Sequence, residues 1–273
     1  MFSMLKDFAG PLSQKVHAPG VTLPPGIHLP CYGPFKPPAG ARALTSFLPE
    51  VNMSVVHHMI LFGGSGPGGR GCMSGHIVYS WARTGQSTPV GLDFFGDGLA
   101  GDGFAVGPGT PNEWFSLQVH YQQMHSLPIM DSSGIRLSFA RAAPRRPIET
   151  TIMASGVLRI PPRVFQDECI ACRVHSGGTV VAWRNHAHRL ARDVWSEVYD
   201  RHGVERPPLG RLSAQLPQIF RLLPAPRKIQ SGDTLLLHCQ YDARETERVS
   251  YVGVDAYPGP RPDPHSHPHP RPR

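Results

Sequence analysis

The chain has 273 residues, a formal net charge of +7, 30 prolines, 29 glycines and only 17% charged side chains. This length suits one large domain or two of ordinary size, and many turn residues with sparse charge favour an all-β protein. The sequence has no basic stripe with interleaved aromatic residues, which argues against nucleic-acid binding. It also has no apolar run of about eighteen residues, so we expect no transmembrane segment.

Residues 1–20 are predicted to be a loose N-terminal arm, and no apolar segment of signal-peptide length is visible in them. Over 21–147, short apolar runs alternate with Gly/Pro turns, the pattern of antiparallel strands in a β-sandwich. The AAPRRP segment at its end is predicted to join this domain to a second β-rich domain over 148–257. Residues 258–273 are rich in Pro, His and Arg and are expected to be disordered, because they cannot bury a core.

One segment of the second domain has a different periodicity. Residues 185–205 place Leu190, Val194 and Val198 at helical spacing. We therefore predict a short amphipathic helix that ends near Gly203 and is inserted between strands.

Two strand-like segments carry three histidines. His57 and His58 separate two apolar runs, and His120 lies in the alternating segment 115–121. Three neutral imidazoles converging from two strands make a site for copper or zinc. Adjacent residues on a regular strand point to opposite faces, so His57 and His58 share one ion only if the strand kinks or one ring uses its nearer nitrogen. A lone histidine beside an apolar run is more often a core residue, so the interpretation depends on the surrounding sequence.

That surrounding sequence resembles the copper type II, ascorbate-dependent monooxygenases, in particular the peptidylglycine α-hydroxylating ones. The matching segments, in chain order, are PGVT (19–22), VHHMILFG (56–63), YSWAR (79–83), LQVHY (117–121), ACRVH (171–175) and QLPQIF (215–220). The resemblance implies two jelly-roll-like antiparallel β-sandwich domains that face each other across a cleft, with one copper ion in each. It also implies hydroxylation of the C-terminal glycine of a peptide by molecular oxygen, with ascorbate as reductant, the first step of peptide amidation.

The resemblance assigns His57, His58 and His120 to the copper ion that relays electrons. All three are present. Gln118 lies two residues before His120 on the same strand face, where it either supports this site or makes a cross-strand structural bond.

The resemblance is incomplete at the oxygen-binding copper site. It implies His175 as one ligand of that site and Arg173 as the arginine that binds the substrate carboxylate. The second histidine is expected at position 177, which is glycine, and no methionine follows Met153 to supply the thioether ligand. The second domain is therefore expected to be truncated, with one of two copper sites intact.

His186 and His188 form a literal His-x-His pair near this position. In the predicted helix, side chains two residues apart would diverge by about 200°, so they would chelate poorly there. Whether either histidine substitutes for the missing ligand stays open at this point.

The resemblance implies a disulfide between Cys31 and Cys72. Gly64 occupies one cysteine position of a second bridge, and Cys239 resembles a bridging cysteine whose partner lies beyond the matching segments. Cys169 and Cys172 form an isolated CxxC, a weak motif without a thioredoxin-like context. Disulfides and the resemblance together favour the secretory pathway or the extracellular space.

Three hypotheses follow from these observations. The first is a peptidylglycine monooxygenase that uses copper, ascorbate and oxygen and acts on peptides as a monomer. The second is a catalytically impaired copper-binding homologue in which only the three-histidine site is intact. The third is a structural or interaction protein with one sandwich and a degraded second half.

Overall fold

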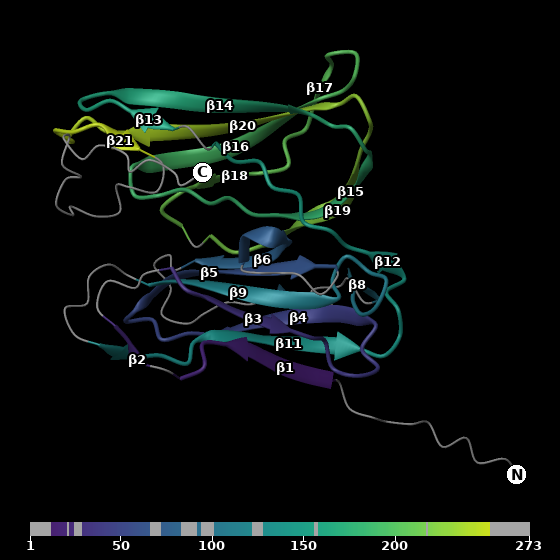
Figure 1. Ribbon diagram of the computed structural model, residues 1–273. Coiled ribbons are helices and arrows are strands. Elements are labelled where there is room, and N and C mark those ends of the chain that lie inside the picture. Colours follow the sequence, from purple (N-terminus) through teal and green to yellow (C-terminus); the bar gives the residue numbers. More distant parts are fainter. Residues whose placement is uncertain are drawn as a thin grey trace, which may run out of the picture.

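The computed structural model describes residues 12–20, 22–24, 29–65, 72–82, 92–93, 101–121, 128–155, 158–216 and 218–251. Regular structure in these ranges is β-strand, apart from the single 3-10 turn η1 (Cys72–Ser74). The strands form two halves stacked on each other (Figure 1). The expectation of an all-β, sandwich-like protein is confirmed. Within the described ranges, no helix is long and apolar enough to cross a membrane.

The N-terminal half contains two main sheets. The first has the order β1-β11-β4-β8-β12, with β7 paired to β4. Its strands are β1 (Leu12–His17), β4 (Ala43–Glu50), β7 (Leu92–Asp93), β8 (Asp102–Ala105), β11 (Gly134–Ala140) and β12 (Arg146–Pro147). The second has the order β3-β9-β5-β6. Its strands are β3 (Cys31–Phe35), β5 (Val56–Gly64), β6 (His76–Ala82) and β9 (Trp114–Tyr121). A short separate pair consists of β2 (Thr22–Leu23) and β10 (Ile129–Met130).

These two sheets pack face to face and enclose the main core (Figure 1). Side chains from alternate strand positions fill it, as expected when one face of each sheet is buried. Leu44 and Phe47 from β4, Leu61 from β5 and Leu117 from β9 are at most 1% exposed. This core anchors β5 and β9, the two strands that carry the three histidines.

The C-terminal half contains one larger sheet with the order β14-β20-β16-β17, and β18 also pairs with β16. Its strands are β14 (Phe165–Arg173), β16 (Ala191–Tyr199), β17 (Glu205–Arg206), β18 (Arg211–Ser213) and β20 (Thr234–Asp242). Two further pairs are β15 (Gly178–Trp183) with β19 (Arg221–Ile229), and β13 (Arg159–Ile160) with β21 (Ser250–Tyr251). The buried cluster of this half is small and consists of Ala191, Val194 and Ala214, with partly buried neighbours.

The predicted helix over 185–205 is wrong. Ala191–Tyr199 is strand β16, which pairs antiparallel with β20 and β18. The spacing of four residues between Val194 and Val198 is compatible with a helix, but it is also an even number, so both side chains face the same side of a strand. Both valines are buried at no more than 4% exposure, and their β-branched side chains favour the strand.

Direct contacts join the two halves. The rings of Tyr79 on β6 and Phe220 stack, with centroids 5.7 Å apart. Arg184, which follows β15, donates from Nη1 to the backbone oxygen of Ser80 at 2.7 Å. The segment after β15 is thereby held against the histidine-bearing sheet.

Candidate metal centre

A bulge in β5 allows two adjacent histidines to serve one site. Val56 pairs with Tyr121 and His58 pairs with His120, and the register shifts between Val56 and His58. His57 is therefore the extra residue of a β-bulge, which bends the strand and re-aims the side chain. This is the kink that the sequence required if both neighbouring histidines were to face the same side.

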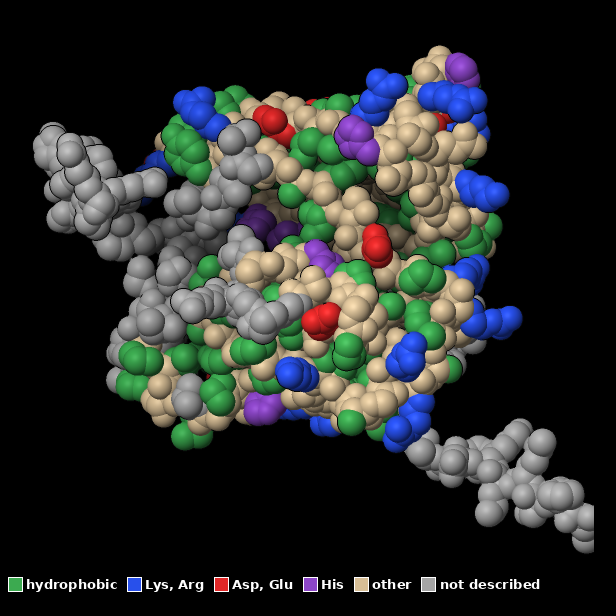
Figure 2. Space-filling model, turned by 45° about the vertical axis from the view of Figure 1, so that its right-hand side comes forward, with side chains coloured by type: hydrophobic (Ala, Val, Ile, Leu, Met, Phe, Trp, Pro, Cys, Tyr) green, Lys and Arg blue, Asp and Glu red, His purple; other side chains and the backbone are tan. Residues whose placement is uncertain are grey.

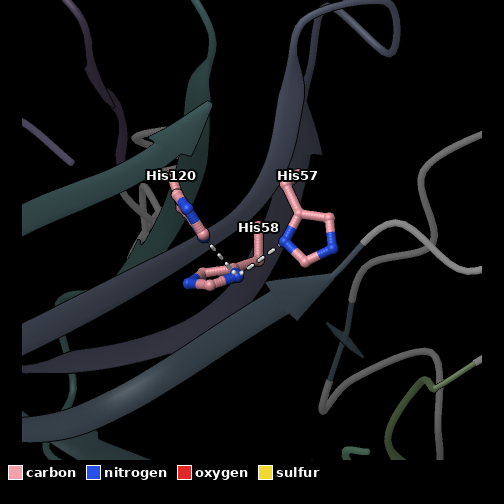
Figure 3. Close-up of side chains that lie close together, drawn as sticks. All are labelled: His57, His58 and His120. Carbon is pink, nitrogen blue, oxygen red and sulfur yellow. Dashed lines mark hydrogen bonds between the residues drawn. The ribbon is translucent and has the colours of Figure 1, made fainter. Parts of the chain in front are cut away.

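The three imidazoles point toward one another (Figure 3). His57 Nδ1 lies 3.1 Å from His58 Nδ1, and His120 Nδ1 lies 3.3 Å from His58 Nδ1. The three ligand atoms all lie within 4.8 Å of one another. Imidazole nitrogens bind a metal at about 2.0–2.1 Å, so two of them on one ion lie about 3–3.5 Å apart. The donor set and its spacing thus fit a copper or zinc ion.

The electrostatics of the cluster keep His58 neutral. Burial, together with repulsion from the neighbouring histidines, first His120 and then His57, lowers its pKa to about 2. A neutral imidazole keeps a lone pair for a metal, whereas a protonated one has none. His58 is therefore able to offer a nitrogen lone pair at every physiological pH.

A second pair of histidines faces this cluster from the C-terminal half. His186 and His188 lie in the irregular segment between β15 and β16. The ring centroids are 6.2 Å apart for His58 and His186, 6.1 Å for His57 and His188, and 5.1 Å within the pair. Histidine side chains line the hollow between the two halves in the space-filling view (Figure 2). Because this segment is irregular rather than helical, the two rings do not diverge as the predicted helix required.

Gln218 fixes the orientation of His186. Its Oε1 lies 2.7 Å from His186 Nδ1, and its Nε2 donates to the backbone oxygens of Ala187 at 2.8 Å and Ala214 at 3.0 Å. Since the amide oxygen can only accept, Nδ1 carries the proton and Nε2 keeps its lone pair. Burial, then Arg184 and His188, lower the pKa of His186 to about 3. His186 is thus a neutral donor that keeps contact with solvent in the hollow.

Arg173 and His175 are not brought to this centre. Both are exposed, Arg173 at the end of β14 and His175 in the turn that leads to β15. The six residues of β15 span roughly 17 Å and separate this turn from Arg184 and the facing histidines. The ACRVH segment thus lies at one end of β15 and the His-x-His pair lies at the other. The signal available in the sequence was Arg184-x-His186-x-His188 followed by the QLPQ segment.

Arg184 is a partly buried cation next to the second histidine pair. Besides its contacts with Ser80, it donates from Nε to the backbone oxygen of Gln218 at 2.6 Å, and its guanidinium lies 5.8 Å from the centre of the Phe220 ring. Burial lowers its pKa to about 10. Among the described residues, no carboxylate forms an ion pair with it.

Cys31 and Cys72 form a disulfide, as the resemblance implied, with Cα atoms 5.8 Å apart. The bond ties β3, which pairs with the His120 strand, to η1, which follows the His57 strand. Of the described cysteines, Cys169, Cys172 and Cys239 are free thiols.

Two groups of histidines thus face each other between the two β-sheet halves, and imidazole donors of this kind suit copper or zinc. A profile of the copper type II ascorbate-dependent monooxygenase C-terminal domain matches residues 149–257. Peptidyl-glycine alpha-amidating monooxygenase of Mus musculus is 30% identical over 253 residues, which cover 87% of this chain and 25% of the mouse protein. Peptidyl-glycine alpha-amidating monooxygenase B of Xenopus laevis is 27% identical over 253 residues, covering 87% of this chain and 28% of that protein. Tyramine beta-hydroxylase of Caenorhabditis briggsae is 26% identical over 167 residues, covering 55% of this chain and 28% of its own length.

The chain belongs to the copper type II, ascorbate-dependent monooxygenase family. It spans about a quarter of the length of the amidating relatives named above.

Proposed function

We propose that this chain hydroxylates the C-terminal glycine of peptides, using two copper ions, molecular oxygen and ascorbate. The observation that carries the proposal is the convergence of two histidine groups in one hollow, His57, His58 and His120 from one half and His186 and His188 from the other. Copper bound there would supply one-electron chemistry and the activation of oxygen. The protein supplies neutral nitrogen donors, which accommodate both Cu(I) and Cu(II).

The second histidine pair changes the proposed ligand assignment. We assign His186 and His188, in place of His175, to the second copper ion. This group then offers two nitrogen donors instead of one, and this sequence has no methionine after Met153 that could add a thioether. The second ion is accordingly held less tightly than the first, since each ligand adds binding energy and preorganisation.

Arg184 takes the role first given to Arg173. The resemblance puts the carboxylate-binding arginine two residues before the first histidine of the pair, and Arg184 has that spacing to His186. A partly buried guanidinium without a described acidic partner favours an incoming carboxylate, which an arginine fork can bind through two hydrogen bonds. Its position beside the second histidine pair would place the substrate glycine next to the second ion.

A catalytically impaired copper-binding homologue is the second candidate, and the missing methionine favours it. In that case electrons from ascorbate reach the first ion but hydroxylation is weak or absent. For either candidate, the Cys31–Cys72 disulfide supports an oxidising compartment such as the secretory pathway.

The test is to supply the purified chain with copper, ascorbate, oxygen and a peptide that ends in glycine. The proposal expects two copper ions per chain by elemental analysis and addition of one oxygen atom to the peptide by mass spectrometry. The same peptide ending in glycinamide is the control, since it lacks the carboxylate. Ascorbate consumption without oxygen transfer to the peptide contradicts the proposal and supports the impaired homologue.

A further inference from the structure

Strand β14 lies at the edge of the C-terminal sheet. All nine of its residues pair with β20, from Phe165 opposite Asp242 to Arg173 opposite Thr234. Within the described ranges no other strand pairs with β14, and in Figure 1 it is the outermost strand of its half. Its outer edge therefore presents unpaired backbone N–H and C=O groups over about 30 Å. Such an edge can accept another strand through main-chain hydrogen bonds.

Charge along β14 is distributed asymmetrically about its central residue, Cys169. Asp167 and Glu168 lie in the first half, and Arg173 ends the second half. Phe165, Asp167, Cys169 and Arg173 are exposed and occupy one face, since they are separated by even numbers of residues. A strand with this arrangement is complementary to its own copy when the copy runs in the opposite direction.

We propose that β14 is a self-association edge, at which two copies of the chain pair antiparallel about a twofold axis through Cys169. In this register Phe165 lies opposite Arg173 of the second copy, a cation–π pair, and Asp167 lies diagonal to the same arginine. Both contacts occur twice because of the symmetry. One like-charge pair, Glu168 with its own copy, is also diagonal and lies on the other face. A parallel in-register alignment would instead place each charged residue opposite itself.

The axis places the two Cys169 residues directly opposite each other. Opposed residues of an antiparallel pair have Cα atoms about 4.5 or 5.5 Å apart, and both values lie in the range that a disulfide spans. The thiol is exposed, with Sγ 3.8 Å from His238 Nε2, so rotation about the Cα–Cβ bond can turn it toward the second copy. A short edge-to-edge interface is small, so the association should depend on concentration.

Disulfide trapping tests the register. The full chain, with its Cys31–Cys72 disulfide intact, is incubated with oxidised glutathione at about pH 8.5, because burial and Glu197 raise the pKa of the Cys169 thiol. One Cys169 thiolate attacks a glutathione sulfur and releases one reduced glutathione. The thiolate of the second copy then attacks the Cys169 sulfur of the mixed disulfide and releases the other. We expect a covalent dimer linked through Cys169 alone, lost in Cys169→Ser and retained in the matched control Cys172→Ser. A dimer linked through Cys172 or Cys239, or no dimer, overturns the proposal.

A charge swap tests the interface without the disulfide. Sedimentation velocity on the Cys169→Ser chain measures the dimer fraction as concentration rises. Asp167→Lys and Arg173→Glu should each weaken the dimer several-fold, because each creates like charges across the axis. The double variant should restore it. Circular dichroism checks that all variants fold. A chain that stays monomeric at every concentration, or a dimer that the single charge changes do not weaken, contradicts the proposal.

Discussion

Replacement of Gln218 by alanine should weaken the second copper site selectively. The substitution removes the acceptor 2.7 Å from His186 Nδ1, so the ring loses the contact that fixes its tautomer and orientation. Hydrogen bonds of this kind behind a metal-binding histidine are worth about 10–100-fold in metal affinity. The three-histidine site lies on the other half, on β5 and β9, and should keep its affinity within about twofold.

The same change also affects stability. Gln218 Nε2 donates to the backbone oxygens of Ala187 and Ala214, so the variant loses these two bonds together with the one to His186. At about 1 kcal/mol each, the loss is about 3 kcal/mol in the free energy of unfolding. Gln215→Ala is the matched control, because Gln215 Nε2 donates to the backbone oxygen of Ala191 at 2.6 Å and Gln215 makes no described contact with a histidine. It should lower stability but leave both copper affinities unchanged.

The assay is competition of the protein with a chelator of known copper affinity, followed by urea unfolding of the metal-free chain. We expect two copper-binding steps in the parent chain. In Gln218→Ala, only the weaker of the two steps should show a lower copper affinity. An unchanged weaker step, or equal losses in both steps, would refute the reasoning that Gln218 orients a metal ligand.

Three further substitutions have defined outcomes. His58→Ala should abolish the tighter copper step in the same competition assay, because His58 Nδ1 is the nitrogen that both other rings approach. Arg184→Lys should lower kcat/KM for a glycine-terminated peptide by about 10–100-fold, because it loses hydrogen bonds to the charged carboxylate of the substrate. Arg173→Lys should leave kcat/KM unchanged. Tyr121→Phe should lower the free energy of unfolding by about 1.5–3 kcal/mol in urea titrations, since its hydroxyl donates to the buried Asp131 carboxylate at 2.7 Å.

The N-terminal half was readable from the sequence because its signals are local. Alternating apolar residues mark the His120 strand, and the adjacent pair His57 and His58 already required a distortion of the other strand. The C-terminal half depends on information that is not local. A four-residue valine spacing fits both a helix and a strand, and pairing with β20 and β18 decides between them.

The residues that we propose for the site in the C-terminal half differ from those that the sequence suggested, for the same reason. Two arginine–histidine segments flank β15, and sequence alone does not say which end of this strand faces the other half. The contact between Arg184 and Ser80, residues 104 positions apart, determines which end of β15 faces the N-terminal half. A pattern of apolar residues along the sequence cannot predict a contact between residues so far apart.

The bulge at His57 makes the first site depend on the length of β5 as well as on its composition. Deleting His57, the residue between Val56 and His58, would restore a continuous ladder of hydrogen bonds between β5 and β9. His58 and His120 would remain paired. The strand would then be more regular and the centre would have two nitrogen donors instead of three. Conversely, histidines placed at neighbouring positions of an unbulged strand in another protein would face opposite sides of the sheet. A design that moves this centre into a different scaffold therefore has to include the extra residue of the bulge. Deleting that residue would disable the metal centre, although the other two ligands would be unchanged.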